Sequence, residues 1–389
     1  MKIIFLSHPL FLGSNSMPRY ANWLSNGMRE RGHEVEIWQP QPKFFNLPAP
    51  ASLKKWLGYI DQYIVFPFVI KSGIKKQPAN TLYVFTDHAL GPWVPYLAKQ
   101  KHIIHCHDFL AQRSAMGSIP QNKTGFGGRM YQKFIRSGYR KGENFISISK
   151  KTQEDLHEFL CDKKPKYSTV VYNGLNQNFS VQDSAICRSE VGSAIGRDVS
   201  AGYFLHVGGN QWYKNRPGVI KIYNHLSQQV GYADLPLVMI GPKPNQQLLN
   251  EREASAVKQN IYLLSDASDD LVKKAYSGAS AFIFPSLAEG FGWPIAEAMA
   301  SGSFVVTTND APMSEVAGDA ALLCDVCPTA TEQQDAWAAK TANAIVEVLD
   351  NPAQKQALVA AGIENAKRFD SEKTLDTIET IYKQITGAN

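Results

Sequence analysis

The stretch that indicates the fold most directly is FPSLAEGFGWPIAEAMASG, residues 284–302. It starts at the end of an apolar run, Ala281–Phe284, of the kind that forms a buried parallel strand. A loop with two glycines follows. A helix is then expected from Pro294, because proline suits the first helical position, to about Gly302. A strand, a short loop and a helix in this order are one unit of a parallel α/β sheet.

The same alternation of short apolar runs and helical stretches continues over the whole chain. In the first half the expected strands are Ile3–Leu6, Glu34–Trp38, Thr81–Phe85, His102–Cys106 and Asn144–Ile148. In the second half they are Tyr203–Val207, Leu237–Ile240, Ile261–Leu264, Ala281–Phe284 and Phe304–Thr307. The two series predict an α/β protein with two facing Rossmann-like domains. Neither series has G-x-G-x-x-G after its first strand, which argues against NAD or FAD chemistry.

The length of 389 residues also favours two domains over a single core. We expect one domain over residues 1–185 and a second over 186–370, with the boundary in the polar stretch Phe179–Gly202. A last segment, 371–389, carries Leu375, Ile378 and Ile381 at helical spacing. Another glycine-rich segment, Gly117–Gly128, is expected to be a loop of the first domain.

Charge is distributed unevenly between the two halves. Residues 1–180 contain 24 Lys and Arg against 11 Asp and Glu, net +13, and the remainder contains 16 against 24, net −8. A basic half suits anionic lipid head groups or a phosphorylated acceptor; the alternative is a scatter of solvated lysines. Leu53–Gln77 is either an amphipathic element that touches a membrane or a core helix with a basic outer face. Nucleic acid is not expected, because no compact aromatic-plus-arginine motif accompanies the charge.

The cysteines and the hydropathy suggest a cytoplasmic protein, with peripheral attachment to the inner face of a membrane as the alternative. Five cysteines, an odd and sparse set, indicate reduced thiols. Cys324 and Cys327 have no second pair to complete a zinc site. No apolar run is long enough to span a bilayer, and the amino-terminal apolar stretch is too short for a signal peptide.

The loop of residues 284–302 also predicts chemistry. Two glycines before a helix let backbone N–H groups approach a ligand, and the helix dipole adds positive charge there, so the loop suits an anion such as a diphosphate. Glu297 is expected in the first turn of the helix, where a carboxylate can accept hydrogen bonds from a ribose, and Glu289 can reach a group beyond the phosphate. Taken singly, Glu297 would be interpreted as a helix-dipole partner and Glu289 as a solvated loop carboxylate; it is their joint spacing around Gly-Phe-Gly-x-Pro that favours a site.

This segment resembles the E-x7-E motif of glycosyltransferase family 4, which has the GT-B fold. The resemblance covers nearly the whole chain. Further matches are Arg31-Gly32-His33-Glu34-Val35, Ser147-Ile148-Ser149-Lys150, Val171-Tyr172-Asn173-Gly174, Val207-Gly208-Gly209 with Lys214-Asn215, and Ser314-Glu315-Val316-Ala317-Gly318-Asp319-Ala320-Ala321-Leu322. The resemblance implies an acceptor-binding first domain, a donor-binding second domain, and a terminal helix that returns to the first domain.

The resemblance also implies roles for individual residues. His107, Glu289 and Lys214 would be catalytic, His107 beside the reacting sugar and Lys214 at the diphosphate. The donor would be bound by Gly13, Asn210, Lys214, Leu264, Ser265, Glu289, Gly290, Phe291, Gly292 and Glu297. His107 has the alternative of a core or loop histidine, as has His105 beside it. The chain departs from the family where an arginine often accompanies the lysine, since Gly209 stands there; Asn210, Tyr213 and Arg216 are the candidates to replace it.

The function implied is retaining transfer of a hexose from a nucleotide diphosphate sugar to a polysaccharide or lipid-linked oligosaccharide. UDP-glucose is the first expectation for the donor and GDP-mannose the second. No metal or other cofactor is expected, because Asp266-Ala267-Ser268-Asp269-Asp270 looks like a helix start rather than a metal motif. The alternatives are a sugar-nucleotide epimerase of similar architecture and a non-catalytic protein that binds nucleotide sugars.

Overall fold

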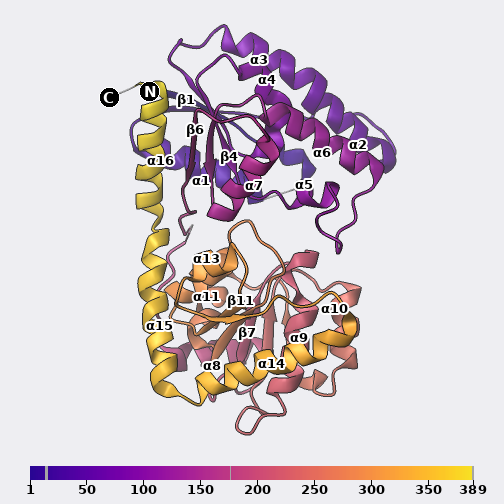
Figure 1. Cartoon of the computed structure of the whole chain (residues 1–389), viewed down its shortest axis with the longest axis vertical. Coiled ribbons are helices and arrows are strands. Elements are labelled where there is room, and N and C mark those ends of the chain that lie inside the picture. Colours follow the sequence, from indigo (N-terminus) through magenta and orange to yellow (C-terminus); the bar gives the residue numbers. More distant parts are fainter. Residues whose placement is uncertain (14–15, 176, 388–389) are drawn as a thin grey trace. The chain divides into compact units, whose positions relative to one another are not determined.

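The computed structural model describes residues 1–389 except 14, 15, 176, 388 and 389. It forms two compact units (Figure 1). The first contains Met1–Asn176 and Ser371–Asn389, and the second contains Gln177–Asp370. The expected boundary at 185/186 therefore lies too far along the chain, because residues 177–185 belong to the second unit.

The first unit is built on a six-stranded parallel sheet with the strand order β2-β1-β3-β4-β5-β6. The strands are β1 Lys2–Leu6, β2 Glu34–Trp38, β3 Leu82–Phe85, β4 His102–Cys106, β5 Asn144–Ser147 and β6 Tyr167–Val170. The five predicted strands are present within a residue at either end. The sequence did not predict β6, an edge strand whose residues are all only partly buried.

Helices cover this sheet on both faces, as the crossover connections of a parallel sheet require. They are η1 Leu10–Leu12, α1 Ser16–Glu30, α2 Ala51–Ile60, η2 Asp61–Val65, α3 Phe66–Ile74, η3 His88–Trp93, α4 Val94–Leu97, α5 Leu110–Ala115, α6 Phe126–Tyr139, α7 Lys150–Leu160 and α16 Ser371–Thr386. Because α6 starts at Phe126, the expected loop 117–128 is shorter, and Gly127 and Gly128 are helical.

The second unit has a six-stranded parallel sheet with the order β12-β11-β10-β7-β8-β9. Its strands are β7 Phe204–Val207, β8 Leu237–Ile240, β9 Ile261–Leu264, β10 Ala281–Phe284, β11 Val305–Thr308 and β12 Leu322–Cys324. Its helices are α8 Ser184–Ile195, η4 Trp212–Lys214, α9 Arg216–Leu226, α10 Gln246–Ala254, η5 Lys258–Asn260, α11 Asp269–Gly278, α12 Trp293–Ala300, α13 Met313–Ala317, α14 Thr331–Leu349, α15 Pro352–Ala366 and η6 Lys367–Phe369. The edge strand β12 was not predicted.

The chain's last helix, α16, completes the core of the first unit beside α1 (Figure 1). Its apolar face packs with β1 and α1 in one buried cluster that includes Phe5, Leu24, Leu375, Ile378 and Tyr382. Polar contacts border this cluster: Arg31 Nη2 lies 2.7 Å from Asp376 Oδ1, and Trp23 Nε1 donates to Ser371 Oγ at 2.9 Å. The helix is therefore part of the first unit's core.

A buried histidine joins α16 to the rest of that core. His105 on β4 has its Nδ1 2.8 Å from the Tyr20 hydroxyl and its Nε2 2.8 Å from the Tyr382 hydroxyl. Burial lowers the pKa of His105 to about 3, so the ring is neutral and carries one N–H. One tyrosine therefore donates to the ring and the other accepts from it. His105 is a core residue.

Within the described residues, no helix combines the length and the hydrophobicity that crossing a membrane requires.

Replacing Tyr382 by Phe is expected to lower the free energy of unfolding by about 1–3 kcal/mol, because the buried Nε2 of His105 loses its partner. Urea unfolding of the purified chain measures the change. Tyr167→Phe is the control, since no hydrogen bond of the Tyr167 hydroxyl is found in the described part of the chain. Equal stability of the two variants would contradict the bridging role of His105.

Candidate functional site

In the second sheet, the direction of chain progression reverses between β7 and β10. The connections from β7 lead to β8 and β9 on one side, whereas β10, β11 and β12 extend the other side. In open parallel sheets the space outside the carboxyl ends of strands at such a reversal is not covered by crossover helices, and ligands bind there. The loop after β7 carries Lys214, and the loop after β10 carries Glu289.

Three contacts hold these two loops together: an ion pair, a backbone hydrogen bond and a hydrogen bond from a side chain. Lys214 Nζ lies 2.8 and 3.0 Å from the two carboxylate oxygens of Glu289. The backbone N–H of Leu287 donates to Tyr213 O at 2.7 Å. The Asn215 side chain donates to Pro285 O at 3.0 Å. The structure thus brings together two residues, Lys214 and Glu289, that the sequence placed in one site.

The ion pair is well shielded from water: the Lys214 and Glu289 side chains are 15% and 7% exposed. Lys214 also lies over the Phe284 ring, with its Nζ 5.1 Å from the ring centroid. Burying two charges costs free energy that a good hydrogen-bonded geometry only partly recovers. The pair therefore places one positive and one negative charge, both largely shielded from water, where the strand order reverses.

Next to the pair, the glycine loop leads into α12. Gly292 is the N-cap of this helix and has φ 101°, a left-handed conformation that favours glycine. Pro294 lies in the first turn of α12, as predicted. Phe291 is 3% exposed and its ring lies 5.3 Å from that of Phe369, so its side chain is part of the packing beneath the loop.

Glu297 lies further along α12 than the sequence suggested. The helix begins at Trp293 and has no acidic residue in its first turn, so Glu297 is not a dipole partner at the helix end. The Tyr276 hydroxyl on α11 donates to Glu297 Oε2 at 2.9 Å. Burial raises the pKa of Glu297 to about 7, although the Tyr276 hydrogen bond and Lys214 lower it. A carboxyl group that is half protonated near neutral pH indicates a functional environment.

Arg216 is one of the three candidates to replace the arginine that often accompanies the lysine in the family. It is 4% exposed, at the start of α9, and burial lowers its pKa to about 10. Its Nη1 donates to Asn210 Oδ1 at 2.6 Å, and Asn210 in turn donates to Lys243 O at 2.7 Å. Among the described residues, its Nε has no hydrogen-bond partner. Arg216 therefore fixes Asn210 and is a buried cation close to the carboxyl ends of β7 and β8.

The close approach of those two strand ends depends on a glycine. A Cβ on Gly241, directly after β8, would lie 2.1 Å from Gly208 O and 3.7 Å from Arg216 Cζ. The next strand, β9, ends at Leu264, whose carbonyl accepts from the Gly241 N–H at 3.1 Å. Leu264 and Ser265 are thus separated from the β7 loop by β8, at the edge of the sheet.

The other two predicted site residues, Gly13 and His107, lie in the first unit. Gly13 closes η1 with φ 73°, and a Cβ there would meet no atom within 4 Å. Ser14 and Asn15, which follow it, lie outside the described residues. His107 is 7% exposed, and its Nε2 donates to Thr86 O at 2.9 Å, because a carbonyl can only accept. In the neutral ring the Nδ1 is then an acceptor.

The sequence analysis missed a polar cluster in the same unit. The first sheet reverses between β1 and β3, and there His8 Nε2 lies 2.9 Å from Asp87 Oδ2, while His88 Nδ1 lies 3.0 Å from Asp87 Oδ1. Burial opposes ionisation of Asp87, but His88 and His8 hold its pKa well below the ordinary range. His8, Asp87 and His107 directly follow the carboxyl ends of β1, β3 and β4, which are neighbours in the sheet. Polar residues at these positions are a sequence signal that could have identified the three together.

The helix expected at the Asp266 segment is present. Ser268 caps α11 by accepting from Leu271 N, and Asp269 and Asp270 lie in its first turn. In the part of the chain that the structure describes, no three His, Cys, Asp or Glu side chains are arranged to hold a metal ion.

Two family models match adjacent parts of the chain. The family described as Glycosyltransferase Family 4 matches residues 17–179, and Glycosyl transferases group 1 matches residues 193–368. The chain is 30% identical to O-antigen chain mannosyltransferase B of Escherichia coli over 184 residues. This matched region is 47% of this chain and 46% of that protein. The chain is also 24% identical over 284 residues to O-antigen chain mannosyltransferase RfbU of Salmonella typhimurium, covering 71% of this chain and 69% of the relative.

Among solved structures, sucrose-phosphate synthase from Thermosynechococcus elongatus superposes over 100% of both chains with a TM-score of 0.74 at 16% sequence identity. At that identity the likeness establishes the architecture. Together with the two parallel sheets and the family matches over both halves, it leads to one conclusion: this chain is a glycosyltransferase of family 4 with the GT-B fold.

Proposed function

We propose that the chain is a retaining hexosyltransferase that takes its sugar from a nucleotide diphosphate bound at the β7/β10 reversal. The observation that carries the proposal is the Lys214–Glu289 pair in front of the glycine loop. A diphosphate would find there the Lys214 ammonium, the amino end of α12 and, close to the neighbouring strand ends, the Arg216 guanidinium. Glu289, released from Lys214, would then accept hydrogen bonds from hexose hydroxyls.

Glu297 would hold the donor ribose through its carboxyl group, which Tyr276 already orients. Asn210, Leu264, Ser265 and the backbone of Gly290, Phe291 and Gly292 would complete the donor site. Gly13 and His107 of the first unit would contact the phosphate side and the hexose. The Nδ1 of His107 suits that role, because it is free to accept a hydroxyl proton when Nε2 donates to Thr86.

In the proposed reaction, the acceptor oxygen bonds to the anomeric carbon from the face that the phosphate leaves. The bond from that carbon to the phosphate oxygen breaks, and the leaving phosphate takes the hydroxyl proton. Lys214 and Arg216 would stabilise the negative charge that develops on the leaving group. We propose that these cations replace a metal ion, so that no metal is required.

The names of two relatives support the proposed acceptor class. The two curated relatives are named as O-antigen chain mannosyltransferases, which supports a saccharide chain, including a lipid-linked one, as acceptor. Because both relatives are named as mannosyltransferases, we propose GDP-mannose as the first donor candidate and UDP-glucose as the second, the reverse of the order expected from the sequence. The basic first unit would meet a lipid-linked acceptor at the inner face of a membrane.

Purified chain is expected to release GDP from GDP-mannose only when a saccharide acceptor is added, and to do so in excess EDTA. Release of nucleotide is measured by coupled assay, with UDP-glucose in a parallel series. Conversion of the sugar nucleotide without acceptor would indicate an epimerase, and binding without release a non-catalytic protein. Activity that EDTA abolishes and magnesium restores would overturn the metal-independent mechanism.

Lys214→Ala is expected to lower kcat by about 10²–10³, because one preorganised donor to the developing charge is lost. Steady-state kinetics with the preferred donor measure the effect. Lys221→Ala is the matched control: it removes a lysine of α9 that is paired with Glu251. An equal loss in both variants would show that Lys214 acts only on stability.

Glu297→Gln is expected to change how stability depends on pH. The folded carboxyl group keeps its proton up to about pH 7, whereas the unfolded one releases it near its ordinary value of 4.5. Between these values the unfolding free energy of the wild type falls as pH rises, by about 3 kcal/mol in all. The variant escapes that loss and keeps a partner for Tyr276, so it gains relative stability at pH 8 but not at pH 4.

Urea unfolding at several pH values measures this difference, with the exposed Glu347→Gln as control. Donor affinity of Glu297→Gln is measured separately and is expected to fall. Parallel stability–pH curves for Glu297→Gln and the wild type would contradict the raised pKa.

A further inference from the structure

One side of the first unit has an unusual concentration of exposed apolar side chains. The three most exposed Phe and Trp side chains of the described residues belong to it: Trp56 is 63%, Phe68 68% and Phe126 75% exposed. We call this surface the α2–α6 face and define it by Leu53, Trp56, Ile64, Phe68 and Val69 of the α2–α3 helix and Phe126, Met130 and Phe134 of α6. Contiguous apolar surface of this kind marks an interaction site.

The apolar residues form stripes along both elements. Ala51–Ile74 is one continuous helical stretch through α2, the π-helical turn η2 and α3, and Trp56, Ile64 and Phe68 are spaced by eight and four residues on it. On α6, Phe126, Met130 and Phe134 follow each other at intervals of four. Residues that recur every four positions share one side of a helix.

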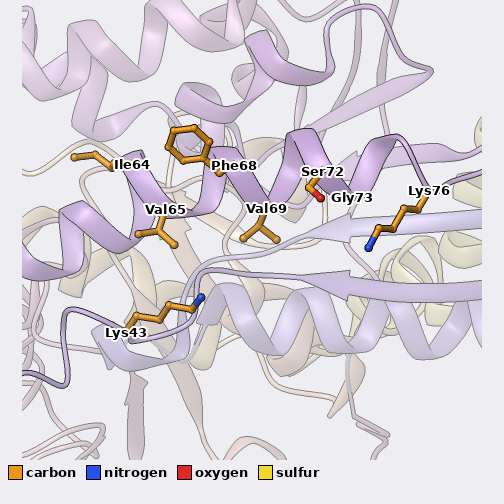
Figure 2. Close-up of a pocket in the computed structure, with 8 residues that line it drawn as sticks. All are labelled: Lys43, Ile64, Val65, Phe68, Val69, Ser72, Gly73 and Lys76. Atoms are coloured by element: carbon orange, nitrogen blue, oxygen red, sulfur yellow. The ribbon is translucent and has the colours of Figure 1, made fainter.

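An open hollow of about 550 Å³ lies along the α3 part of this surface. Ile64, Val65, Phe68 and Val69 supply its apolar lining, and Lys43 and Lys76 border it. Figure 2 shows Lys43 beneath Val65 and Lys76 at the far end of the row, so that both ammonium groups lie beside the apolar lining.

Aromatic contacts join the two elements into a single surface. Tyr59 stacks on Tyr131 with ring centroids 5.7 Å apart, and the Tyr63 hydroxyl lies 2.6 Å from the Tyr131 hydroxyl. The ring of Phe134 lies 5.5 Å from that of Tyr63. The stripes of α2 and α6 are therefore parts of one rigid surface.

The charges on this surface are of one sign. Residues 39–80 contain six Lys and one acid, Asp61, which is 1% exposed and accepts from the N–H groups of Phe44 and Phe45. Residues 109–142 contain seven Lys and Arg and no Asp or Glu. Of these thirteen basic side chains, only Arg113 forms an ion pair within the described residues.

We propose that the α2–α6 face docks the protein on the head-group region of an anionic lipid bilayer. Exposed Trp and Phe insert at the boundary of head groups and acyl chains, while unpaired lysines attract anionic lipids. The Lys71 ammonium lies 5.1 Å from the centroid of the Tyr96 ring, next to the exposed Phe68 side chain, so positive charge and apolar surface adjoin on this face. This inference extends the lipid-linked acceptor of the proposed function, and its test needs no turnover.

The test is sedimentation of the full chain with vesicles of phosphatidylcholine alone or with about 30% phosphatidylglycerol. We expect binding to the anionic vesicles to be about tenfold tighter or more, and to weaken in about 0.5 M NaCl. Trp56→Ser with Phe68→Ser should lower the partition coefficient about tenfold while the preference for anionic lipid remains. Lys75→Glu with Lys76→Glu should lower binding to anionic vesicles by about tenfold and leave binding to neutral ones unchanged.

Matched controls come from the second unit. Ile186→Ser with Val230→Ser changes side chains that are 61% and 98% exposed, and Lys258→Glu with Lys340→Glu reverses two exposed lysines. Both controls should bind vesicles as the wild type does. Circular dichroism and nucleotide-sugar affinity of all variants should match the wild type, because the changed side chains are on the surface.

Equal binding of the wild type to neutral and anionic vesicles, or equal losses in the control variants, would overturn the proposal. A second outcome would also overturn the proposal: the wild type does not bind vesicles but forms a concentration-dependent dimer in sedimentation velocity, and the Trp56 and Phe68 substitutions dissociate that dimer. Failure of the transferase assay with intact vesicle binding would count against the proposed function alone.

Discussion

The reversal of strand order between β7 and β10 is the constraint on which the candidate donor site depends. Because successive connections leave this point in opposite directions, the carboxyl ends of the two strands are not covered by a crossover helix. Two loops therefore lie side by side at the carboxyl ends of these central strands. The Lys214–Glu289 pair, a hydrogen bond from the Asn215 side chain and one backbone hydrogen bond hold them together. The first sheet reverses between β1 and β3, and there Asp87 is held by two histidines.

Most of the sheet could be predicted because buried parallel strands read as continuous apolar runs. β6 was missed because it is an edge strand with only partly buried residues and no such run, and β12 is an edge strand of three residues, Leu322–Cys324. The loop from β10 into α12 was predicted from its glycines and proline. The position of Glu297 was not, because helix starts are uncertain by a residue or two, and one residue decides whether a carboxylate is in the first turn.

Features that depend on strand order could not be predicted from local patterns. His8 and Asp87 are 79 residues apart and meet only because β1 and β3 are neighbours. The burial of Arg216 likewise follows from the close approach of β7 and β8 at Gly208 and Gly241. The partners of the two histidines could not be predicted either: His105 contacts two tyrosine hydroxyls and His107 one backbone carbonyl.

The place of α16 in the first unit has a consequence for biosynthesis. Its residues are separated from α1 by about 340 positions, so a ribosome releases the entire second unit before Leu375 and Tyr382 can reach Tyr20 and Leu24. Until then the apolar cluster on one side of the amino-terminal sheet is exposed to water. Exposed hydrophobic surface of this kind is what chaperones bind. The second unit, a continuous segment, needs no such late partner and can fold first.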